Sequence, residues 1–539
     1  MRKTLLSGLA LLFSLSFALW GRPERSPTPT PAAPRASENP PDVPARERFR
    51  PTPPQPESKF PPPQQSREEE ERESNQPGEP QLLRGEPGVF LDGEPFPPRQ
   101  AYQPNFPEAR RLRYVAGDAS NDGDGSFQHP WKDLQDALCK LEPGDRLLLS
   151  AGIYSGSFRI AGGCRDGTAE APIQVYSRHA FLKPSGSGDV LTVERSHWQF
   201  WEVQIALLDS TAAGFVTGGA RARHIAVDQS HIYEGKGPAV RLAAGSEDVV
   251  LSNCHIHQSM GVRIERGAAR ITLVNNHIHH NRSASVTVGA AASTGSSDSA
   301  PSVRDVSIVG NRIHNDRGAA LELAQCEDVK ISRNRFSNYR PDEDRGGTAI
   351  EVGQGCRGVR VETNSVLEAT VGVSLGSAPS AGAAAPSRVV IERNYLENRL
   401  TSDGTAVRIE SGRDVRFSNN VVDHYSEAFR VANGAERVVI ANNLVLAPRA
   451  GFHLPAAGIA LFDFNVFGAT ALPDARIGGG EVSPESWKTR MPHSRLVPGL
   501  DLKERDLGRI VGFAASDAGK ALDGVPFKGA APDIGVAER

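Results

Sequence analysis

The chain has 539 residues, of which 38% are hydrophobic and 23% charged, and its formal net charge is −3. This near balance, with no basic patch interleaved with aromatic residues, gives no sign of nucleic-acid binding. The length would allow several domains, but a repeat of about 23 residues indicates that most of the chain forms one body.

The first 18 residues have the composition of a signal peptide. Arg2 and Lys3 precede an apolar stretch from Leu5 to Leu19, and Ser16-Phe17-Ala18 supplies small residues for a signal peptidase. We therefore expect a secreted, periplasmic or cell-surface protein. An uncleaved membrane anchor is the alternative, and with cleavage we expect no stable membrane insertion.

Residues 19–108 are rich in proline and glutamate. Runs such as PTPTPAAP and FPPPQQ surround the acidic stretch from Arg67 to Glu73. Such a segment buries too little apolar surface to offset the entropy lost on ordering. It is predicted to be a disordered linker.

The globular part, residues 109–539, opens with cap elements. Arg113–Ala116 is predicted to be a strand, Trp131–Leu141 an amphipathic helix, and Arg146–Leu149 a second strand. Cys139 and Cys164 are expected to form a disulfide near this cap.

A short phrase then recurs about ten times, with copies such as VSIVGNRI, VKISRNRF and VVIANNLV. One position in it is mostly asparagine, and the spacing of this position is 23 residues where no loop intervenes. The asparagines are Asn276, Asn311, Asn334, Asn364, Asn394, Asn420 and Asn443. A fixed period of this size predicts a solenoid.

Each repeat contains three short stretches in which apolar and polar residues alternate. In one copy these are Ala239–Leu242, Val249–Leu251 and His255–His257. Alternation predicts strands with one buried face. Three strands in each turn, stacked in parallel, predict an all-β parallel β-helix of about eleven coils. The asparagine is expected at the bend between the second and third strands, bonded to its equivalent one coil away.

Cys326 and Cys356 each stand three residues before the first apolar residue of equivalent strands, Val329 and Val359. Adjacent strands lie about 4.8 Å apart, within the Cα separation that a disulfide bridges. An inter-coil disulfide is therefore predicted. Cys254 occupies the asparagine position and is expected to be a buried, inert thiol.

The segment from Tyr114 to Gly156, YVAGDASNDGDGSFQHPWKDLQDALCKLEPGDRLLLSAGIYSG, resembles the opening of the bacterial secreted right-handed parallel β-helix proteins of the pectate-lyase-like superfamily. Ser516–Gly519 and Pro532–Glu538 resemble their closing motif. The resemblance implies a right-handed β-helix with an N-terminal cap and first coils at 109–190, repeats at 191–467 and a C-terminal cap at 468–539.

The resemblance also implies a substrate cleft on the first strand of each repeat. The middle residue of each such strand is expected to point to solvent; we call these residues the outward column. Its members are Val216, Arg241, Arg263, Thr287, Glu322, Glu351, Ser374, Arg408 and Arg430. Two glutamates thus lie between two pairs of arginines, with Glu265 and Glu410 one step further along their strands.

Arginines at this spacing are suited to the carboxylates of an acidic polysaccharide. Glu322 and Glu351 would repel one another unless one is protonated or a cation lies between them, and calcium is the cation that suits carboxylate oxygens. We therefore predict Glu322, Glu351, Arg263 and Arg408 as catalytic residues, and Arg241, Arg430, Thr287 and Arg317 as substrate-binding residues of a monomeric protein. Proton abstraction at the uronate C5 would lead to β-elimination or epimerisation.

The base for this reaction is not evident, because no lysine occupies the outward column. Lys236, Arg282, Arg317, Tyr339 and Arg340 are the neighbouring candidates. The chain lacks the Asn-Lys-Ser segment of chondroitinase-B-like and related alginate lyases, the Asp-Pro-His motif of mannuronan epimerases, and the paired aspartates and Gly-His-Gly of polygalacturonases. A glycoside hydrolase using the two glutamates, and a non-catalytic envelope protein, are the alternatives.

Two further features come from the repeat. Histidines form two predicted columns, His231, His255 and His277 in one and His257, His279 and His314 in the other, which could bind a transition metal or be solvated residues at the edge of the groove. The segments Gly289–Ser302 and Gly376–Ser387 follow first strands, and Arg340–Gly347 precedes one. These three segments are expected to border the cleft.

Overall fold

The structure is a computed structural model. It describes residues 89–91, 94–96, 102, 105–219, 221–290, 301–339, 347–376, 384–399, 403–446, 451–468, 474–497, 519–522 and 534–535. The predicted signal peptide, most of the linker and most of the closing motif lie outside these residues.

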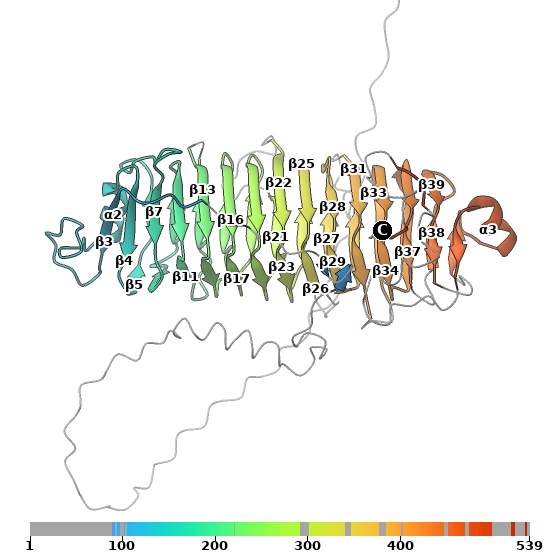
Figure 1. The fold of residues 1–539 in the computed structure, drawn as a ribbon, viewed down its shortest axis with the longest axis horizontal. Coiled ribbons are helices and arrows are strands. Elements are labelled where there is room, and N and C mark those ends of the chain that lie inside the picture. The colour runs from blue at the N-terminus through green and yellow to red at the C-terminus, as the bar shows by residue number, and fades with distance from the viewer. Residues whose placement is uncertain are drawn as a thin grey trace, which may run out of the picture. The chain divides into compact units, whose positions relative to one another are not determined.

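The described residues from Arg111 onward form the predicted parallel β-solenoid, in which each coil contributes one strand to each of three sheets (Figure 1). We call them sheets one, two and three, in the order in which a repeat enters them. Sheets one and two are hydrogen-bonded into one 27-stranded network, because the long strands β33 and β35 continue from the first sheet into the second. Sheet three is a separate hydrogen-bonded sheet of 14 strands.

Sheet one carries the outward column. Its strands are β6 (Phe158–Ile160), β9 (Leu191–Val193), β12 (Phe215–Thr217), β15 (Val240–Leu242), β18 (Val262–Glu265), β21 (Val286–Ala290), β24 (Leu321–Leu323), β27 (Thr348–Val352), β30 (Val371–Leu375), the first parts of β33 (Thr405–Ser418) and β35 (Glu427–Glu436), β38 (Gly451–Leu454) and β41 (Ala475–Ile477), with β42 (Gly480–Glu481) antiparallel at its end.

Sheet two begins in the cap. Its strands are β3 (Arg111–Val115), β4 (Asp145–Leu149), β7 (Ile173–Tyr176), β10 (Trp198–Trp201), β13 (Arg223–Asp228), β16 (Glu247–Ser252), β19 (Ala269–Val274), β22 (Val303–Val309), β25 (Cys326–Ser332), β28 (Arg360–Glu362), β31 (Ser387–Glu392), the second part of β33, β36 (Val438–Ala441) and β39 (Ile459–Asp463).

Sheet three carries the histidine columns. Its strands are β5 (Gly152–Ser155), β8 (Ala180–Lys183), β11 (Gln204–Ala206), β14 (His231–Tyr233), β17 (His255–His257), β20 (His277–His279), β23 (Arg312–His314), β26 (Arg335–Tyr339), β29 (Ser365–Ala369), β32 (Tyr395–Glu397), β34 (Val421–Asp423), β37 (Leu444–Val445), β40 (Val466–Phe467) and β43 (Arg495–Leu496). Fourteen strands exceed the predicted eleven coils, because the terminal coils lack the repeated phrase.

Two helices and one hairpin complete the described elements. The predicted cap helix is confirmed as α2 (Leu134–Lys140), shorter than expected, with Asp133 accepting a hydrogen bond from the Asp136 amide at its N-terminus. α3 (Pro484–Arg490) follows the last coils, and β1 (Val89–Leu91) pairs with β2 (Glu94–Phe96). Within the described residues, no helix is long and apolar enough to cross a membrane.

The interior is a continuous stack of Val, Ile, Leu and Phe side chains. In sheet one the strand pattern is buried, half-exposed, buried, as in Val240, Arg241 and Leu242. Parallel pairing in strict register places each apolar side chain directly above its equivalent one coil away. The repeat therefore buries its apolar surface between coils, which a single repeat could not do alone.

The asparagine ladder lies at the predicted bend. The Asn334 backbone amide and its Nδ2 both donate to Oδ1 of Asn364, at 2.9 and 3.0 Å, and the same pair of bonds recurs from Asn276 to Asn465. The residue before each asparagine is left-handed, including Thr363 with φ of 57°. The asparagine amides thus satisfy the backbone groups that this bend removes from the strands.

The cysteine predictions have two outcomes. Cys139 and Cys164 are disulfide-bonded, and Cys254 is buried at the ladder position, as expected. Cys326 and Cys356 are both buried at equivalent positions of adjacent coils with Sγ atoms 3.0 Å apart, but both are free thiols in the structure. The predicted alignment is correct, and the predicted bond is not formed here.

Candidate functional site

The outward column is confirmed in register. Each member from Val216 to Arg430 pairs with the next across adjacent strands of sheet one, so the nine residues stand in one line. The line continues to His453 on β38, which the sequence analysis did not include. At about 4.8 Å per strand, the nine predicted positions span about 38 Å.

Not every member of the column is open to solvent. Val216 and Ser374 are buried, at 3% and 1% exposure, which corrects the expectation that all middle residues point outward. Glu265 is also buried at 2%, whereas Glu410 is 44% exposed along its side chain. The open, charged part of the column is therefore Arg241, Arg263, Glu322, Glu351 and Arg408 with Arg430.

Glu322 and Glu351 lie side by side at the centre of the column, on β24 and β27. Partial burial raises the pKa of Glu322 above its usual value, and the negative charge of Glu351 raises it further. Thr287 and Ser374 flank the pair in register. The centre thus holds a carboxyl group that binds its proton more tightly than a free glutamate does, next to a second carboxyl group.

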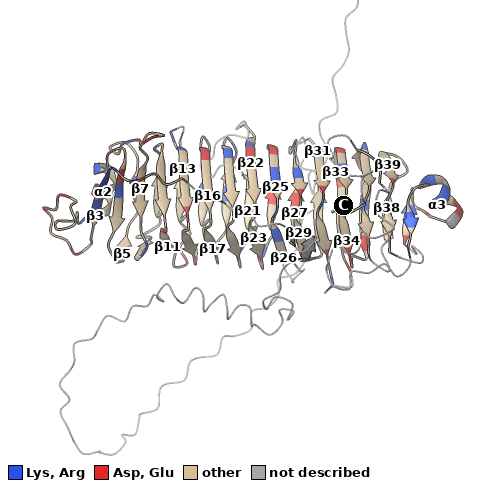
Figure 2. Cartoon of the chain, in the orientation of Figure 1, with Lys and Arg blue, Asp and Glu red and all other residues tan. Residues whose placement is uncertain are grey.

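The arginines on either side already contact acidic or polar side chains. Arg241 forms an ion pair with Asp189, and Nη2 of Arg408 donates to Oγ of Ser374 at 3.3 Å. Nε of Arg430 donates to both carboxylate oxygens of Glu427, at 3.0 and 2.8 Å. In Figure 2, basic and acidic residues are interspersed along the solenoid. The column is therefore a line of mixed charge.

Glu427 is the hub of a polar cluster that the sequence analysis missed. Its buried carboxylate accepts hydrogen bonds from Arg430 and from Thr405 Oγ1 at 2.8 Å, and it contacts Nδ1 of His453. Arg430 keeps 53% of its side chain exposed, so it remains open to a ligand. Glu427 lies three residues before Arg430 on β35, and only the register of the coils reveals this grouping.

The candidates for a catalytic base differ in their exposure and in their partners. Lys236 and Arg317 are exposed in the turns before sheet one, Arg282 forms an ion pair with Asp209 at 2.8 Å, and Arg340 lies outside the described residues. Tyr339 is an incorrect candidate. It is 2% exposed and donates to Oδ2 of Asp316 at 2.6 Å, and burial followed by the Asp316 charge raises its pKa well above the usual value.

The predicted border segments are mostly outside the described residues. Their anchoring strands are described: one insertion lies between β21 and β22, one between β30 and β31, and one precedes β27. The first two occur at the same corner, between sheets one and two, on coils adjacent to those of Glu322 and Glu351. The insertion points agree with the prediction, and the path of the segments themselves stays a prediction.

Sheet two has a separate surface hollow of about 420 Å³. Its charged edge is internally paired, because Arg270 contacts both Asp248 at 2.5 Å and Glu247 at 2.6 Å. The lining residues are His224, Ile225, Ala226, Asp248, Val250, Arg270, Thr272 and Asp305.

The two histidine columns are confirmed on sheet three. His231, His255 and His277 are in register, and Tyr233, His257, His279 and His314 form the neighbouring line. The first line is half-exposed and the second is buried. The ring centroids of stacked histidines in each line lie 4.7–5.1 Å apart from coil to coil.

The histidines also meet diagonally between the two lines. Nε2 atoms of His231 and His257 are 2.8 Å apart, those of His255 and His279 are 2.6 Å apart, and those of His277 and His314 are 2.8 Å apart. Burial, together with neighbouring imidazoles, lowers the pKa of His231 to about 3 and that of His255 to about 2. These imidazoles are neutral at pH 7 and therefore offer lone pairs.

Comparison with known proteins agrees with this fold. The family model described as "Right handed beta helix region" matches residues 295–467. No curated protein matches the chain.

Three of the solved structures that resemble this chain are named as three different enzymes. The first is pectate lyase Pel9A, at 17% identity and a TM-score of 0.30, covering 80% of this chain and 97% of that chain. An alginate lyase from Paenibacillus sp. str. FPU-7 has 16% identity and a TM-score of 0.35, covering 57% and 94%. GH136 lacto-N-biosidase from Eubacterium ramulus has 12% identity and a TM-score of 0.34, covering 68% of each chain.

At these identities and scores the likenesses do not extend to a substrate or a reaction. The strand order, the three parallel sheets and the family match agree with one another over the repeats. The chain therefore folds as a parallel β-helix, and its residues 295–467 match the right-handed β-helix family model.

Proposed function

We propose that this protein is carbohydrate-active and binds an acidic polysaccharide along the outward column. The observation that carries the proposal is the unbroken register from Arg241 to Arg430, with two glutamates between two pairs of arginines. A polymer with one carboxylate in each sugar unit matches such a line, because arginine binds carboxylates through paired donors.

The arginines can exchange partners on binding. Arg430 uses its Nε for Glu427 and leaves its exposed end toward solvent. Arg241 is held by Asp189, which is itself partly exposed. A uronate carboxylate would therefore join or replace acidic side chains of the protein, and binding should weaken steeply as salt rises.

Glu322 and Glu351 are proposed to carry the reaction. In β-elimination, a column arginine such as Arg263 or Arg408 neutralises the substrate carboxylate, and an ionised glutamate removes the C5 proton. The C4–C5 double bond then forms as the C4–O glycosidic bond breaks, and the leaving oxygen takes a proton from the other glutamate or from water. Calcium between the two glutamates would serve the same neutralising role. These two carboxylates alone supply fewer than the six to eight oxygens that calcium takes, so substrate and water would have to complete its coordination.

Glycosidic hydrolysis is the second candidate, favoured by one specific observation. The raised pKa of Glu322 beside the charge of Glu351 is the arrangement expected for a general acid next to a second carboxylate. Strand spacing of about 4.8 Å is close to the separation of about 5–5.5 Å used by retaining hydrolases.

The test is a screen of alginate, pectate and chondroitin with the full chain, with and without calcium. Ultraviolet absorbance of unsaturated products reports a lyase, reducing ends without that absorbance report a hydrolase, and retardation in affinity gels reports binding.

Glu322→Gln and Glu351→Gln are expected to lower turnover at least about 100-fold while retaining binding, as loss of general acid–base catalysis does. Glu351→Gln removes a charge that raises the pKa of Glu322, so it should shift to lower pH the limb of the pH profile that Glu322 governs. This is the acid limb if Glu322 is the base and the alkaline limb if Glu322 is the general acid.

Glu436→Gln is the matched control. This residue is exposed at the end of β35, six residues after Arg430, and pairs with Arg413 at 2.9 Å. It should leave turnover and binding unchanged. Binding without turnover would support a non-catalytic envelope protein. The proposal fails if no acidic polymer binds, or if both column variants leave binding and turnover intact.

A further inference from the structure

We propose that the histidine columns of sheet three form a binding site for one first-row transition-metal ion of the zinc class. Seven of the 14 histidines of the chain gather on β14, β17, β20 and β23 and the turn after β20. They lie on a different sheet from the outward column. The proposal is therefore independent of the polysaccharide function.

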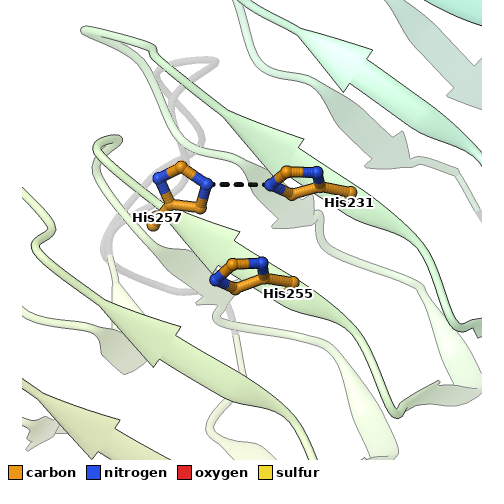
Figure 3. Close-up of side chains that lie close together, drawn as sticks. All are labelled: His231, His255 and His257. Atoms are coloured by element: carbon orange, nitrogen blue, oxygen red, sulfur yellow. Dashed lines mark hydrogen bonds between the residues drawn. The ribbon is translucent and has the colours of Figure 1, made fainter. Parts of the chain in front are cut away.

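Two groups of three have the geometry of a ligand set. One ring nitrogen from each of His231, His255 and His257 lies within 4.8 Å of the other two, and the same holds for His255, His277 and His279. Figure 3 shows the first group: the rings of His231 and His257 face one another through Nε2, and His255 lies beside both. We call these groups triad one and triad two.

The distances require only a small adjustment to admit an ion. Zinc bonds imidazole nitrogen at about 2.0–2.1 Å, so two ligands of a tetrahedral ion lie about 3.3–3.4 Å apart. The His231–His257 pair at 2.8 Å would open by about 0.5 Å, and the third nitrogen would move inward from within 4.8 Å. Rotation of the side chains about χ1 and χ2 supplies such shifts without moving the strands.

The surroundings suit a borderline metal ion. Imidazole is a ligand for zinc, nickel and copper, and three histidines leave a fourth position for water or another small ligand. His257 and His279 are buried and held in register on the sheet, whereas His231 and His255 are half-exposed and provide access from solvent. A site that is rigid on one side and open on the other pre-organises the ligands.

The structure also limits where the ion can lie. The column of His277 continues directly into Arg312, whose positive charge disfavours a cation at the His277–His314 end. Triad two contains His277 and so lies next to that charge, whereas triad one is further from it and is the favoured position. The two triads share His255, and one Nε2 lone pair binds one ion, so a single ion is expected for each chain.

The experiment uses the full chain without a polyhistidine tag, freed of metal by chelator and dialysis. Titration with Zn²⁺ in a calorimeter should give one bound ion, and Co²⁺ should produce the visible absorption of a tetrahedral complex. His255→Gln removes a ligand from both triads and should weaken binding by more than about tenfold, since even loss of an outer-shell partner costs 10–100-fold.

Further variants separate a built site from a general effect on folding. His231→Gln disrupts triad one alone and His277→Gln triad two alone, so each should retain one ion, whereas the double variant should lose it while keeping His255. His179→Gln, at an exposed histidine just before β8 and two coils from β14, is the control and should bind as the parent does. Far-ultraviolet circular dichroism verifies the fold of each variant.

The proposal is overturned if the parent binds neither Zn²⁺ nor Co²⁺, which would leave the columns as hydrogen-bonded stacks. It is equally overturned if the folded double variant binds as tightly as the parent. Loss of binding in His179→Gln would also contradict it, because the ion would then be held elsewhere.

Discussion

The asparagine ladder and the outward column are both lines of one residue per coil, but they differ in how each residue is satisfied. Every ladder asparagine bonds to the same residue type one coil away, with nearly identical distances. Members of the outward column pair with different partners, such as Asp189, Ser374 and Glu427. Burial explains the difference, because buried polar groups must be bonded within the protein and exposed groups can use water.

This contrast separates positions that hold the fold from positions that are free to carry function. The histidine columns lie between the two extremes, since one line is buried and the other half-exposed. In the ladder the same hydrogen bond is repeated from each coil to the next, so each coil must supply an asparagine at this position. Along an outward face only the backbone must repeat, and side chains can vary.

The largest expected effect comes from breaking the ladder. Asn364→Ala removes the acceptor for the Asn334 backbone amide and the donor to Ile331 O at 2.9 Å, and so leaves buried backbone groups unpaired. We expect a loss of about 3–4 kcal/mol in unfolding free energy, measured by urea denaturation. Glu351→Gln in the outward column is the comparison and should change stability by less than about 1 kcal/mol. Equal losses in the two variants would refute the distinction.

The cysteine pair tests whether a buried column can hold a covalent bond between coils. With Sγ atoms 3.0 Å apart, Cys326 and Cys356 should form a disulfide under oxidising conditions. Closing a loop of about 30 residues would add about 3–4 kcal/mol to stability. Mass spectrometry after non-reducing digestion detects the bond, and Cys326→Ser should abolish the gain. Persistent free thiols after oxidation would show that the coils hold the sulfurs apart.

The last expected effect depends on pH and concerns Asp316, which is buried near the corner between sheets three and one. Its Oδ1 accepts hydrogen bonds from the backbone and side-chain amides of Asn281 at 2.9 and 3.0 Å, but burial outweighs these bonds and raises its pKa to about 7. Between the usual carboxyl pKa and pH 7 the folded state therefore holds a proton that the unfolded state lacks. Stability should fall as pH rises through this window, by up to about 1.4 kcal/mol per pH unit.

The matching variant is Asp316→Asn, which keeps an acceptor for Asn281 and carries no charge. Its unfolding free energy should lack this fall with pH, so the difference between variant and parent should grow from pH 4 to pH 7 and then level off. A constant difference across that range would mean that Asp316 is ionised in the folded protein throughout.

Much of the fold and the line of the candidate site could be predicted from the sequence. In a parallel solenoid, residues one repeat apart become neighbours, so counting along the chain places Glu322 beside Glu351 and His231 beside His255. The bend at each asparagine followed from the same counting, because a recurrent amide at one position of each coil has only its equivalents as partners.

Contacts across the columns depended on the tertiary structure. The Arg430–Glu427–His453 cluster, the burial of Tyr339 against Asp316, and the diagonal Nε2 contacts of the histidines join residues at different positions of the repeat. The period specifies which coil a residue occupies and which face it lies on. Rotamers and the shape of each corner decide which side chains meet sideways, and these depend on packing between coils that no single repeat contains.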